Sequence, residues 1–488
     1  MSRPLTNTVD IPVADTTVGP LLLLRAADRD FISLAAVVIT PVDARPARLR
    51  APLRSVKPLA LARLAGVAIW RFDFRLSARP DAGYYYGDHW YPVRADLTGD
   101  LDLAFVACNG REQGDTRRDL SERNALWRHL AAVNRVSPLH LLLHGGDQLY
   151  ADELLSLDPV LRAWADLDAP LPADDEIPAD LDRQMLAYMV RRYCDLYRQP
   201  GIAALITRVP SLMMWDDHDI CDGWGSLPVE RLDHPVGRLV FSVARRAFCL
   251  FQLGVDPDQP LPGPMWDAGG DHVGWGVALP GVDIVAPDLR SQRRPDRVLA
   301  PSGWQALTRS LTATTAERVL VISSVPGLGP RLSGVETLLG LWPGSQKYED
   351  DLRDQWQSRA HREEWRWFLE ALLAVHERDD QRVTLLSGEI HLATRGELAA
   401  STVPLHQLVA SGIAHPPPPT GYARALGALA RLGSSPLPGH PIRMRPLPGQ
   451  RRIYCNQRNY LLLRRRERAW SACWQLEYDG PSPLLGLD

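Results

Sequence analysis

The chain has 488 residues, of which 45% are hydrophobic and 23% are charged, and its formal net charge is −3. This length allows one large domain with a smaller one beside it, and the composition is that of a folded globular chain rather than a disordered or fibrous one. A net charge so close to zero excludes a general electrostatic attraction to nucleic acids or to membrane surfaces.

The N-terminal residues carry no visible export signal. Residues 1–8 lack a basic segment followed by an apolar core. The apolar residues 21–24 are soon followed by charged residues, whereas a bilayer span needs about 20 apolar residues. The cysteines form neither a short-spaced zinc pattern nor a dense disulfide framework; they stand at positions 108, 194, 221, 249, 455 and 473. We therefore expect a cytoplasmic protein.

Short β-prone segments separated by proline and glycine occupy the first hundred residues. Residues 31–40 form an apolar run, residues 68–76 contain alternating apolar and charged residues, and residues 83–93 are rich in tyrosine. Helical periodicity is nearly absent. This pattern predicts a small N-terminal β-sandwich domain over residues 1–98, in which we identify no chemically reactive cluster.

From residue 99 onward, apolar strand segments alternate with segments of helical spacing. The strand segments are 101–107, 139–143, 211–215, 282–286, 319–325 and 383–386. The helical segments are 120–134, 180–198 and 361–376. The alternation predicts a layered α/β domain over residues 99–488. Residues 426–450 mix small residues with glycine, proline and arginine, and we expect them to be irregular within a C-terminal extension.

Polar residues follow four of these strand segments. Cys108 follows the first, Asp147 and Tyr150 the second, Asp217 and His218 the third, and Glu389 and His391 the last. Because loops at the carboxyl ends of strands in open α/β sheets converge on one crevice, we expect these side chains to meet. A thiol, carboxylates, a phenol and imidazoles together make a metal site plausible.

In order along the chain, these motifs resemble those of the metallophosphoesterase, or calcineurin-like, superfamily, and most closely its PhoD-like alkaline phosphatase and phosphodiesterase branch. The motifs are Ala-Cys-Asn at 107–109, Gly-Asp-Gln-Leu-Tyr at 146–150, Trp-Asp-Asp-His-Asp at 215–219 and Ser-Gly-Glu-Ile-His at 387–391. Asp-Leu-Arg at 288–290 is similar to a further element of that family. The resemblance covers roughly residues 100–420 and implies a four-layer αββα sandwich.

The resemblance also implies a ligand set for two or more metal ions. Asp147 would bridge them, Cys108 and Tyr150 would hold Fe(III), and Asp217 would bind the second metal. The remaining matched ligands are Glu389 and His391. The oxygen-rich second position favours Ca, Mn or Mg over zinc.

Two further residues take catalytic roles by the same resemblance. His218 would act as proton donor or charge stabiliser, and Arg290 would clamp phosphate oxygens, a task that suits its planar fork. The expected reaction is hydrolysis of a phosphomonoester or phosphodiester by a metal-activated hydroxide at a binuclear centre. The expected substrate is a small-molecule, lipid or nucleotide phosphoester, and no oligomeric state is predicted.

Three departures from the family pattern concern the metal ligands. Gly110 stands where the superfamily has its first histidine ligand, and Glu389 is one methylene longer than the usual aspartate. The superfamily also has a histidine element between the third and the last motif. Residues 319–326 stand at the corresponding place in this chain and contain no histidine. These departures bear on the identity of the metals more than on whether metals bind.

Other interpretations of the same residues exist. Taken alone, Cys108 could be a small buried hydrophobe, Asp147 could cap a turn, and Tyr150 could simply pack. The alternative function is a metal-binding module of the same fold that has lost catalysis. A serine hydrolase would need a Gly-x-Ser-x-Gly elbow, and residues 223–226 (Gly-Trp-Gly-Ser) lack that spacing. His415 and His406 are possible further pocket residues.

Overall fold

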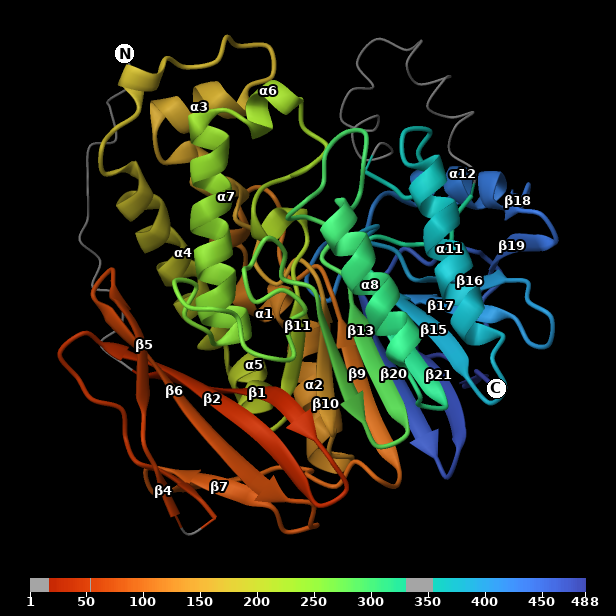
Figure 1. The fold of residues 1–488 in the computed structure, drawn as a ribbon, viewed down its shortest axis with the longest axis horizontal. Helices are drawn as coiled ribbons and strands as arrows, with labels where there is room; N and C mark the ends of the chain where they lie inside the picture. Colours follow the sequence, from red (N-terminus) through yellow and green to blue (C-terminus); the bar gives the residue numbers. More distant parts are fainter. Residues whose placement is uncertain (1–16, 53, 331–353) are drawn as a thin grey trace.

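The computed structural model describes residues 17–52, 54–330 and 354–488 (Figure 1). Residues 1–8, inspected above for an export signal, lie outside the described residues. Among the helices that are described, none combines the length and the apolar character needed to cross a membrane.

An eleven-stranded sheet runs through the whole molecule. In spatial order its strands are β22 (Gly480–Pro481), β21 (Ala469–Leu476), β20 (Asn459–Arg466), β9 (Leu101–Val106), β10 (Leu141–Gly145), β11 (Ser211–Met214), β1 (Val18–Ala27), β2 (Phe31–Pro41), β6 (Val67–Ser77) and β5 (Leu59–Leu64), with β23 (Leu485–Gly486) paired to β21. At its centre β9, β10 and β11 are parallel. All residues of these three strands are buried, as expected for parallel strands covered on both faces.

Two further sheets complete the β structure. The eight-stranded sheet has the order β12 (Trp275–Leu279), β13 (Val282–Ala286), β14 (Arg318–Ile322), β15 (Arg382–Ser387), β17 (Leu405–Val409), β16 (Thr394–Leu398), β19 (His440–Arg445) and β18 (Ser434–Leu437). The four-stranded sheet has the order β4 (Arg54–Val56), β3 (Leu49–Ala51), β7 (Gly83–Tyr86) and β8 (His89–Pro92).

The two large sheets share one hydrophobic core. Along β14, Leu320 and Ile322 belong to the same buried cluster as Phe105 of β9. Their neighbours Val319 and Val321 belong to a second cluster, on the other face of the eight-stranded sheet. This division follows from the alternation of side chains along a strand, and it places the two sheets face to face.

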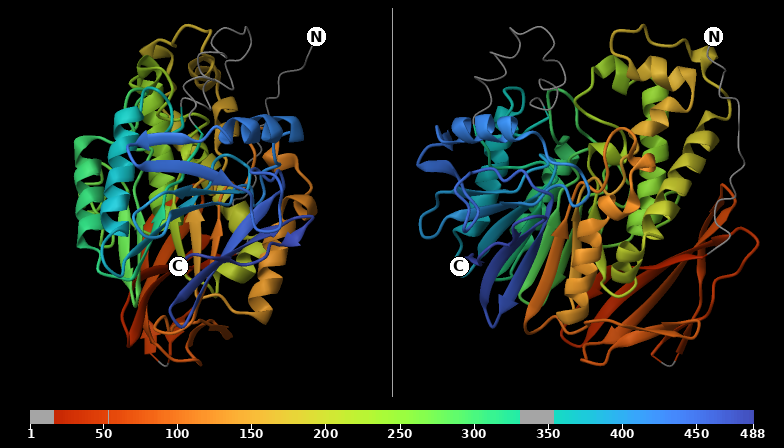
Figure 2. Two further views of the ribbon diagram at one scale, coloured as in Figure 1. Left: turned by 90° about the vertical axis from the view of Figure 1, so that its right-hand side faces the viewer. Right: turned by 180° about the vertical axis from the view of Figure 1, so that it is seen from behind.

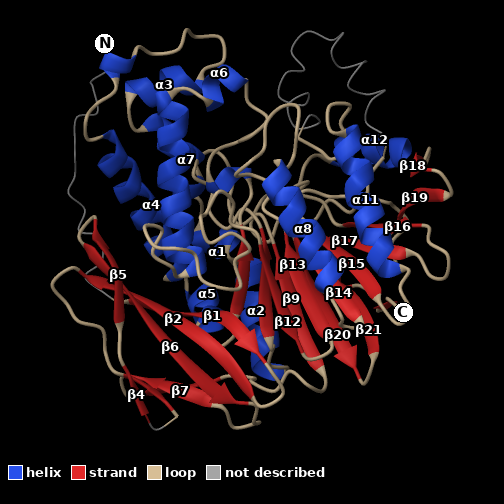
Figure 3. Ribbon diagram, viewed as in Figure 1, coloured by secondary structure: helices blue, strands red, loops and turns tan. Residues whose placement is uncertain are grey.

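Helices cover the outer faces. They are α1 (Leu120–Arg123), α2 (Ala125–Val136), α3 (Pro159–Ala165), α4 (Leu181–Tyr197), α5 (Pro200–Ile206), α6 (Val229–Leu232), α7 (Pro235–Phe248), α8 (Pro301–Ala313), α11 (Arg362–His376) and α12 (Thr420–Ala430). Helices α8 and α11 lie on the eight-stranded sheet, and α2 lies on the far side of the eleven-stranded one (Figures 2 and 3). In α11, Trp365, Phe368 and Leu372 recur at helical spacing and are buried against that sheet. The mixed α/β class expected from the sequence is confirmed.

An independent N-terminal sandwich is not confirmed. The four-stranded sheet does pack on β6, with Phe74 against Tyr84 at 5.3 Å between ring centroids. However, β6 belongs to the eleven-stranded sheet, because β1 pairs in parallel with β11 at Leu23 and Ser211. The sheet therefore continues across the predicted boundary at residue 98, and the β-prone composition of residues 1–98 reflects a shared sheet.

Residues 426–450 are also more regular than predicted. They contain the end of α12 and the antiparallel strands β18 and β19. In β19, Ile442 and Met444 are buried and Arg443 between them is exposed. The strands are short, each contains one proline, and Gly439 lies between them, so the alternation is too brief to recognise in the sequence.

Four buried histidines make stability dependent on pH. Burial lowers the pKa of His140, His144, His361 and His406 to about 4, from an ordinary 6.5. The unfolded chain therefore binds more protons than the folded chain between these values. We expect the contribution of these four histidines to the free energy of unfolding to be present in full above pH 6.5 and to fall as the pH is lowered toward 4. Buried carboxyl groups with raised pKa values, such as Asp219 at about 7 and Asp216 at about 6, act in the opposite direction.

Chemical denaturation at pH 7.5, 6 and 5 measures this dependence. The variant His406→Leu should lose less stability than the wild type between pH 7.5 and 5, because it lacks one histidine with a lowered pKa. Leucine should be tolerated there, since Nδ1 of His406 is buried without a hydrogen-bond partner among the described residues. An unchanged pH dependence in His406→Leu would remove His406 from the explanation, and a larger loss of stability on acidification in the variant than in the wild type would contradict the prediction.

Candidate metal centre

The predicted ligands lie on loops that follow strands of both large sheets and meet at one place. Cys108 follows β9, Asp147 follows β10, Asp217 begins a short 3-10 helix (Asp217–Asp219) after β11, and His391 follows β15 of the other sheet. The two sheets approach closely here: a Cβ atom at Gly388 would lie 2.5 Å from the Cβ atom of Ala107. Only glycine permits this approach, which brings the loops together.

Backbone strain is concentrated on these loops. Seven non-glycine residues of the described chain have positive φ angles, and four of them are predicted ligands: Cys108 (55°), Asp147 (55°), Glu389 (63°) and His391 (54°). Such conformations cost on the order of 1–3 kcal/mol each and collect where function requires them. This strain cannot be read from the sequence, and it supports the functional role that the sequence predicts for these four positions.

A first group of possible ligands consists of Cys108, Asp147 and His391, whose donor atoms lie within 4.8 Å of one another. The hydroxyl of Tyr150 lies 3.0 Å from Nε2 of His391 and 3.4 Å from Oδ2 of Asp147. The Sγ atom of Cys108 is 3.5 Å from the same oxygen. Thiol, phenol, carboxylate and imidazole therefore surround a single point.

A second group consists of Asp147, Asp217 and His218, also within 4.8 Å. Asp147 thus belongs to both groups. Its side chain is buried, and its Oδ1 atom has no hydrogen-bond partner among the described residues. Burial and the neighbouring carboxylates, Asp217 foremost, raise the pKa of Asp147 well above its ordinary value. A cation would relieve this unfavourable arrangement, so the donor set fits metal binding.

Glu389 lies outside both groups. Its two carboxylate oxygens accept hydrogen bonds from Nε2 of Gln355 at 2.8 and 2.9 Å. It lines the cavity beside Asp217. The structure therefore places this predicted ligand at the edge of the site.

Arg290 does not occupy the position predicted for a phosphate clamp. Its guanidinium is fully buried and contacts Asp216, Asp354 (2.6 and 2.8 Å) and Asp217 (3.4 Å). With three carboxylates around it, the group holds Asp217 in place instead of facing a substrate. Asp354, which is also bound by Arg293 at 3.0 Å, was not anticipated, because no sequence motif surrounds it.

Removing the charge of Arg290 should therefore destabilise the fold. We expect Arg290→Leu to lower the free energy of unfolding by about 3–5 kcal/mol, because it leaves buried carboxylates without a counter-charge. Chemical denaturation in EDTA measures this without a contribution from metal binding. An unchanged stability together with a raised KM for a phosphoester would instead restore the clamp interpretation.

His218 is oriented by a carboxylate that sequence reasoning missed. Its Nδ1 atom lies 2.9 Å from Oδ2 of Asp152, and its ring stacks on that of Tyr150 at 4.2 Å. Burial lowers the pKa of His218, but Asp152 and then Asp217 more than offset this effect, so its pKa is raised. The only signal for Asp152 in the sequence is its place two residues after Tyr150.

Two other unpredicted contacts complete the centre. The ring of His415 stacks on His391 with centroids 3.4 Å apart, and its Nε2 atom lies 3.4 Å from both carboxylate oxygens of Glu112. His415 thus lies at the site, as considered from the sequence. His406, the other histidine considered from the sequence, lies on β17 and is buried. It lines neither of the two cavities at this centre.

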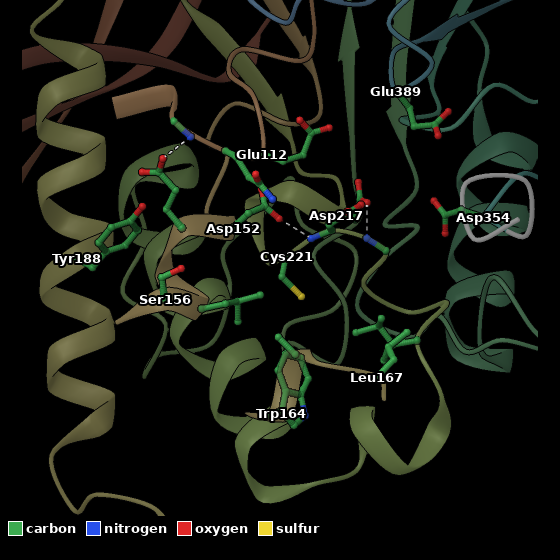
Figure 4. Close-up of a pocket in the computed structure, with 18 of the residues that line it drawn as sticks. Glu112, Asp152, Ser156, Trp164, Leu167, Tyr188, Asp217, Cys221, Asp354 and Glu389 are labelled. Carbon is green, nitrogen blue, oxygen red and sulfur yellow. Dashed lines mark hydrogen bonds between the residues drawn. The ribbon is translucent and has the colours of Figure 1, made fainter. Parts of the chain in front are cut away.

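Two cavities open at this centre, with volumes of about 840 and 530 Å³. Both are lined by Glu112, Asp217, Asp222 and Glu389. Figure 4 shows the larger one, with Glu112, Asp217 and Glu389 on one side and Trp164 and Leu167 on the other. The smaller one also reaches Asp147, His218 and His391.

Comparisons with known proteins bear on the fold and on the family. A solved structure described as "Structure of PhoD" superposes with a TM-score of 0.56 at 12% identity, covering 95% of this chain and 88% of that one, which establishes a shared fold. Another, described as "GAP50 the anchor in the inner membrane complex of Plasmodium", has a TM-score of only 0.40 at 7% identity, covering 80% and 89%.

Among curated sequences, the uncharacterized protein YGR266W of Saccharomyces cerevisiae is 23% identical over 374 residues, or 64% of this chain and 53% of that protein. The chain thus spans about half the length of this relative. The family described as PhoD related phosphatase matches residues 104–347. That match covers half of the chain and includes Cys108, Asp147, Tyr150 and the 215–219 motif, so the chain belongs to the PhoD-related phosphatase family.

Proposed function

We propose that this protein hydrolyses phosphoesters with the help of two metal ions. The observation that carries the proposal is the position of Asp147, which belongs to both ligand groups and has a buried oxygen without a partner. Cys108, Tyr150 and His391 would complete one position, and Asp217 the other. The thiol and phenol suit Fe(III), and the second position suits Ca, Mn or Mg.

Bound there, the metal ions would neutralise charge on the phosphoryl oxygens and activate a water molecule. Asp217 lines both cavities and Asp147 lines the smaller one, so a substrate in either cavity would reach the proposed ligands. Asp152 holds one ring nitrogen of His218, and the other would donate a proton to the departing alcohol oxygen. The retention of these residues together speaks against a module that has lost catalysis.

Elemental analysis and hydrolysis assays test the proposal together. The purified protein is stripped with EDTA and then supplied with iron alone and with iron plus calcium, manganese or magnesium. Hydrolysis of bis(4-nitrophenyl) phosphate and 4-nitrophenyl phosphate is followed for each preparation. We expect two bound metals and activity that depends on them. A protein that binds metal without hydrolysing either ester would leave only a metal-binding role, and a protein that binds no metal would contradict both functions.

A further inference from the structure

The two cavities meet at the candidate metal centre, and their number indicates how many organic groups the substrate phosphate carries. They share Glu112, Asp217, Asp222 and Glu389, so each opens on the same point from a different direction. A phosphodiester has two alcohol groups on one phosphorus, and each could enter one cavity. A phosphomonoester would leave one cavity without an organic group to fill it.

The smaller cavity is largely apolar away from the centre. The apolar side chains of its lining include Leu328, Ile390, Val409, Leu426, Met444 and Tyr454, and Gln355, Gln357 and Thr394 add uncharged polar groups. Leu328, Val409 and Tyr454 are almost fully buried, and Leu426, on α12, is half-buried. Apolar surface gains about 25 cal/mol per Å² on leaving water, whereas a charged group here would lose its hydration. This cavity therefore favours an apolar alcohol group.

The larger cavity carries negative charge. Besides the shared residues, Asp152 and Glu153 line it. Among its described lining residues Arg117 is the only arginine or lysine, and the described lining of the smaller cavity has neither. Asp152 and Glu153 already accept hydrogen bonds, respectively from the backbone of Asp222 at 2.7 Å and of Gly114 at 2.6 Å. Asp152 also faces His218 at 2.9 Å and Glu153 faces Arg192 at 3.6 Å. The repulsion of an anion therefore rests on the excess of acidic side chains in this lining, which also includes Glu112, Asp217, Asp222, Asp354 and Glu389.

We propose, on the basis of the function above, that the substrate is a phosphodiester with a single phosphate, an apolar alcohol in the smaller cavity and no second anionic group. Polyphosphates, nucleotides with more than one phosphate and nucleic acid strands would place additional negative charge against carboxylates or apolar walls. The charge of the two cavities thus selects against them, while the metal centre itself accepts any phosphoester.

Two synthetic diesters test this directly. One is 4-isopropylbenzyl 4-nitrophenyl phosphate and the other is 4-carboxybenzyl 4-nitrophenyl phosphate, which differ in charge but little in shape. We expect kcat/KM to be at least about tenfold higher for the isopropyl compound, whichever cavity the benzyl group enters. Equal values, a preference for the carboxylate, or a higher kcat/KM for 4-nitrophenyl phosphate than for the diesters would overturn the inference.

A variant of α12 adds a positive charge to the smaller cavity. We expect Leu426→Arg to shift the ratio of the two kcat/KM values toward the carboxylate by about tenfold. Ala425→Arg is the matched control, because Ala425 is an exposed neighbour on the same helix that does not line the cavity. An equal shift in both variants would mean that the cavity is not responsible.

Bis(4-nitrophenyl) phosphate, assayed with each metal preparation, distinguishes a failure of the proposed function from a failure of the inference about the substrate. If no preparation hydrolyses it, the proposed function fails. If it is hydrolysed but the isopropyl and carboxyl diesters react equally well, the function stands and the inference about charge is wrong.

Discussion

Replacing Asp147 by asparagine is expected to abolish the binding of both metals and to lower kcat/KM by about 10³-fold or more. Asp147 is the one residue common to both ligand groups, so its loss removes a donor from each position. A 10³-fold loss corresponds to about 4 kcal/mol of transition-state stabilisation, in keeping with the several kcal/mol that metal ions supply.

The stability of this variant distinguishes a ligand from a structural carboxylate. Metal binding stabilises the native state by mass action, so the melting temperature of the wild type should rise when metal is restored after EDTA. The variant should show no such rise. In EDTA, however, it should be no less stable than the wild type, because the substitution removes a buried carboxylate whose Oδ1 atom has no partner. Asp100→Asn, at an exposed site, serves as the control.

A variant with Asp147→Asn that retains both metals would show that Asp147 is not a bridging ligand. A variant that is unstable in EDTA would show that its role is structural. Either result can be read from elemental analysis and thermal unfolding without an activity assay.

Replacing His218 by glutamine is expected to lower kcat by about 10²- to 10⁴-fold, the range for a positioned proton donor, while the metal content stays unchanged. Asp152 fixes one ring nitrogen of His218, and glutamine cannot donate a proton in the same way. Because a poor leaving group needs protonation more than a good one, the loss should be larger for methyl phenyl phosphate than for methyl 4-nitrophenyl phosphate.

This dependence on the leaving group separates the two roles open to His218, which also belongs to the second ligand group. If His218 is a metal ligand, the variant should lose metal and both diesters should be affected equally. Asp152→Asn should reproduce part of the dependence with metal retained, since Asp152 acts on His218 by orienting its imidazole ring and raising its pKa.

Much of the central architecture follows from local patterns. The buried apolar runs correspond to β9, β10, β11 and β15, and helical spacing at 361–376 corresponds to α11 (Arg362–His376). Because parallel strands direct the loops after them toward the same edge, the residues after those strands could be predicted to meet, and the structure brings Cys108, Asp147, Tyr150, Asp217, His218 and His391 together.

Partners that come from distant parts of the chain could not be predicted in this way. Asp354 reaches Arg290 across 64 positions, and Glu112 reaches His415 across 303. Arg290 itself has the sequence context of a phosphate contact, and only the three carboxylates around it reveal that its charge is already neutralised. Such neutralisation depends on burial and on tertiary contacts, which no local motif records.

The pairing of β1 with β11 affects how the chain can be truncated and how it folds. Strand β11, whose loop carries Asp217 and His218, is flanked by β10 and β1. A fragment that starts at residue 99 would leave β11 as an edge strand, paired only with β10 and open to pairing with other chains. Pairing strands so far apart in the chain also carries the slow kinetics of high contact order. The N-terminal strands therefore support β11, the strand that precedes Asp217 and His218. Truncating them should lower the solubility of the protein before it alters the candidate site.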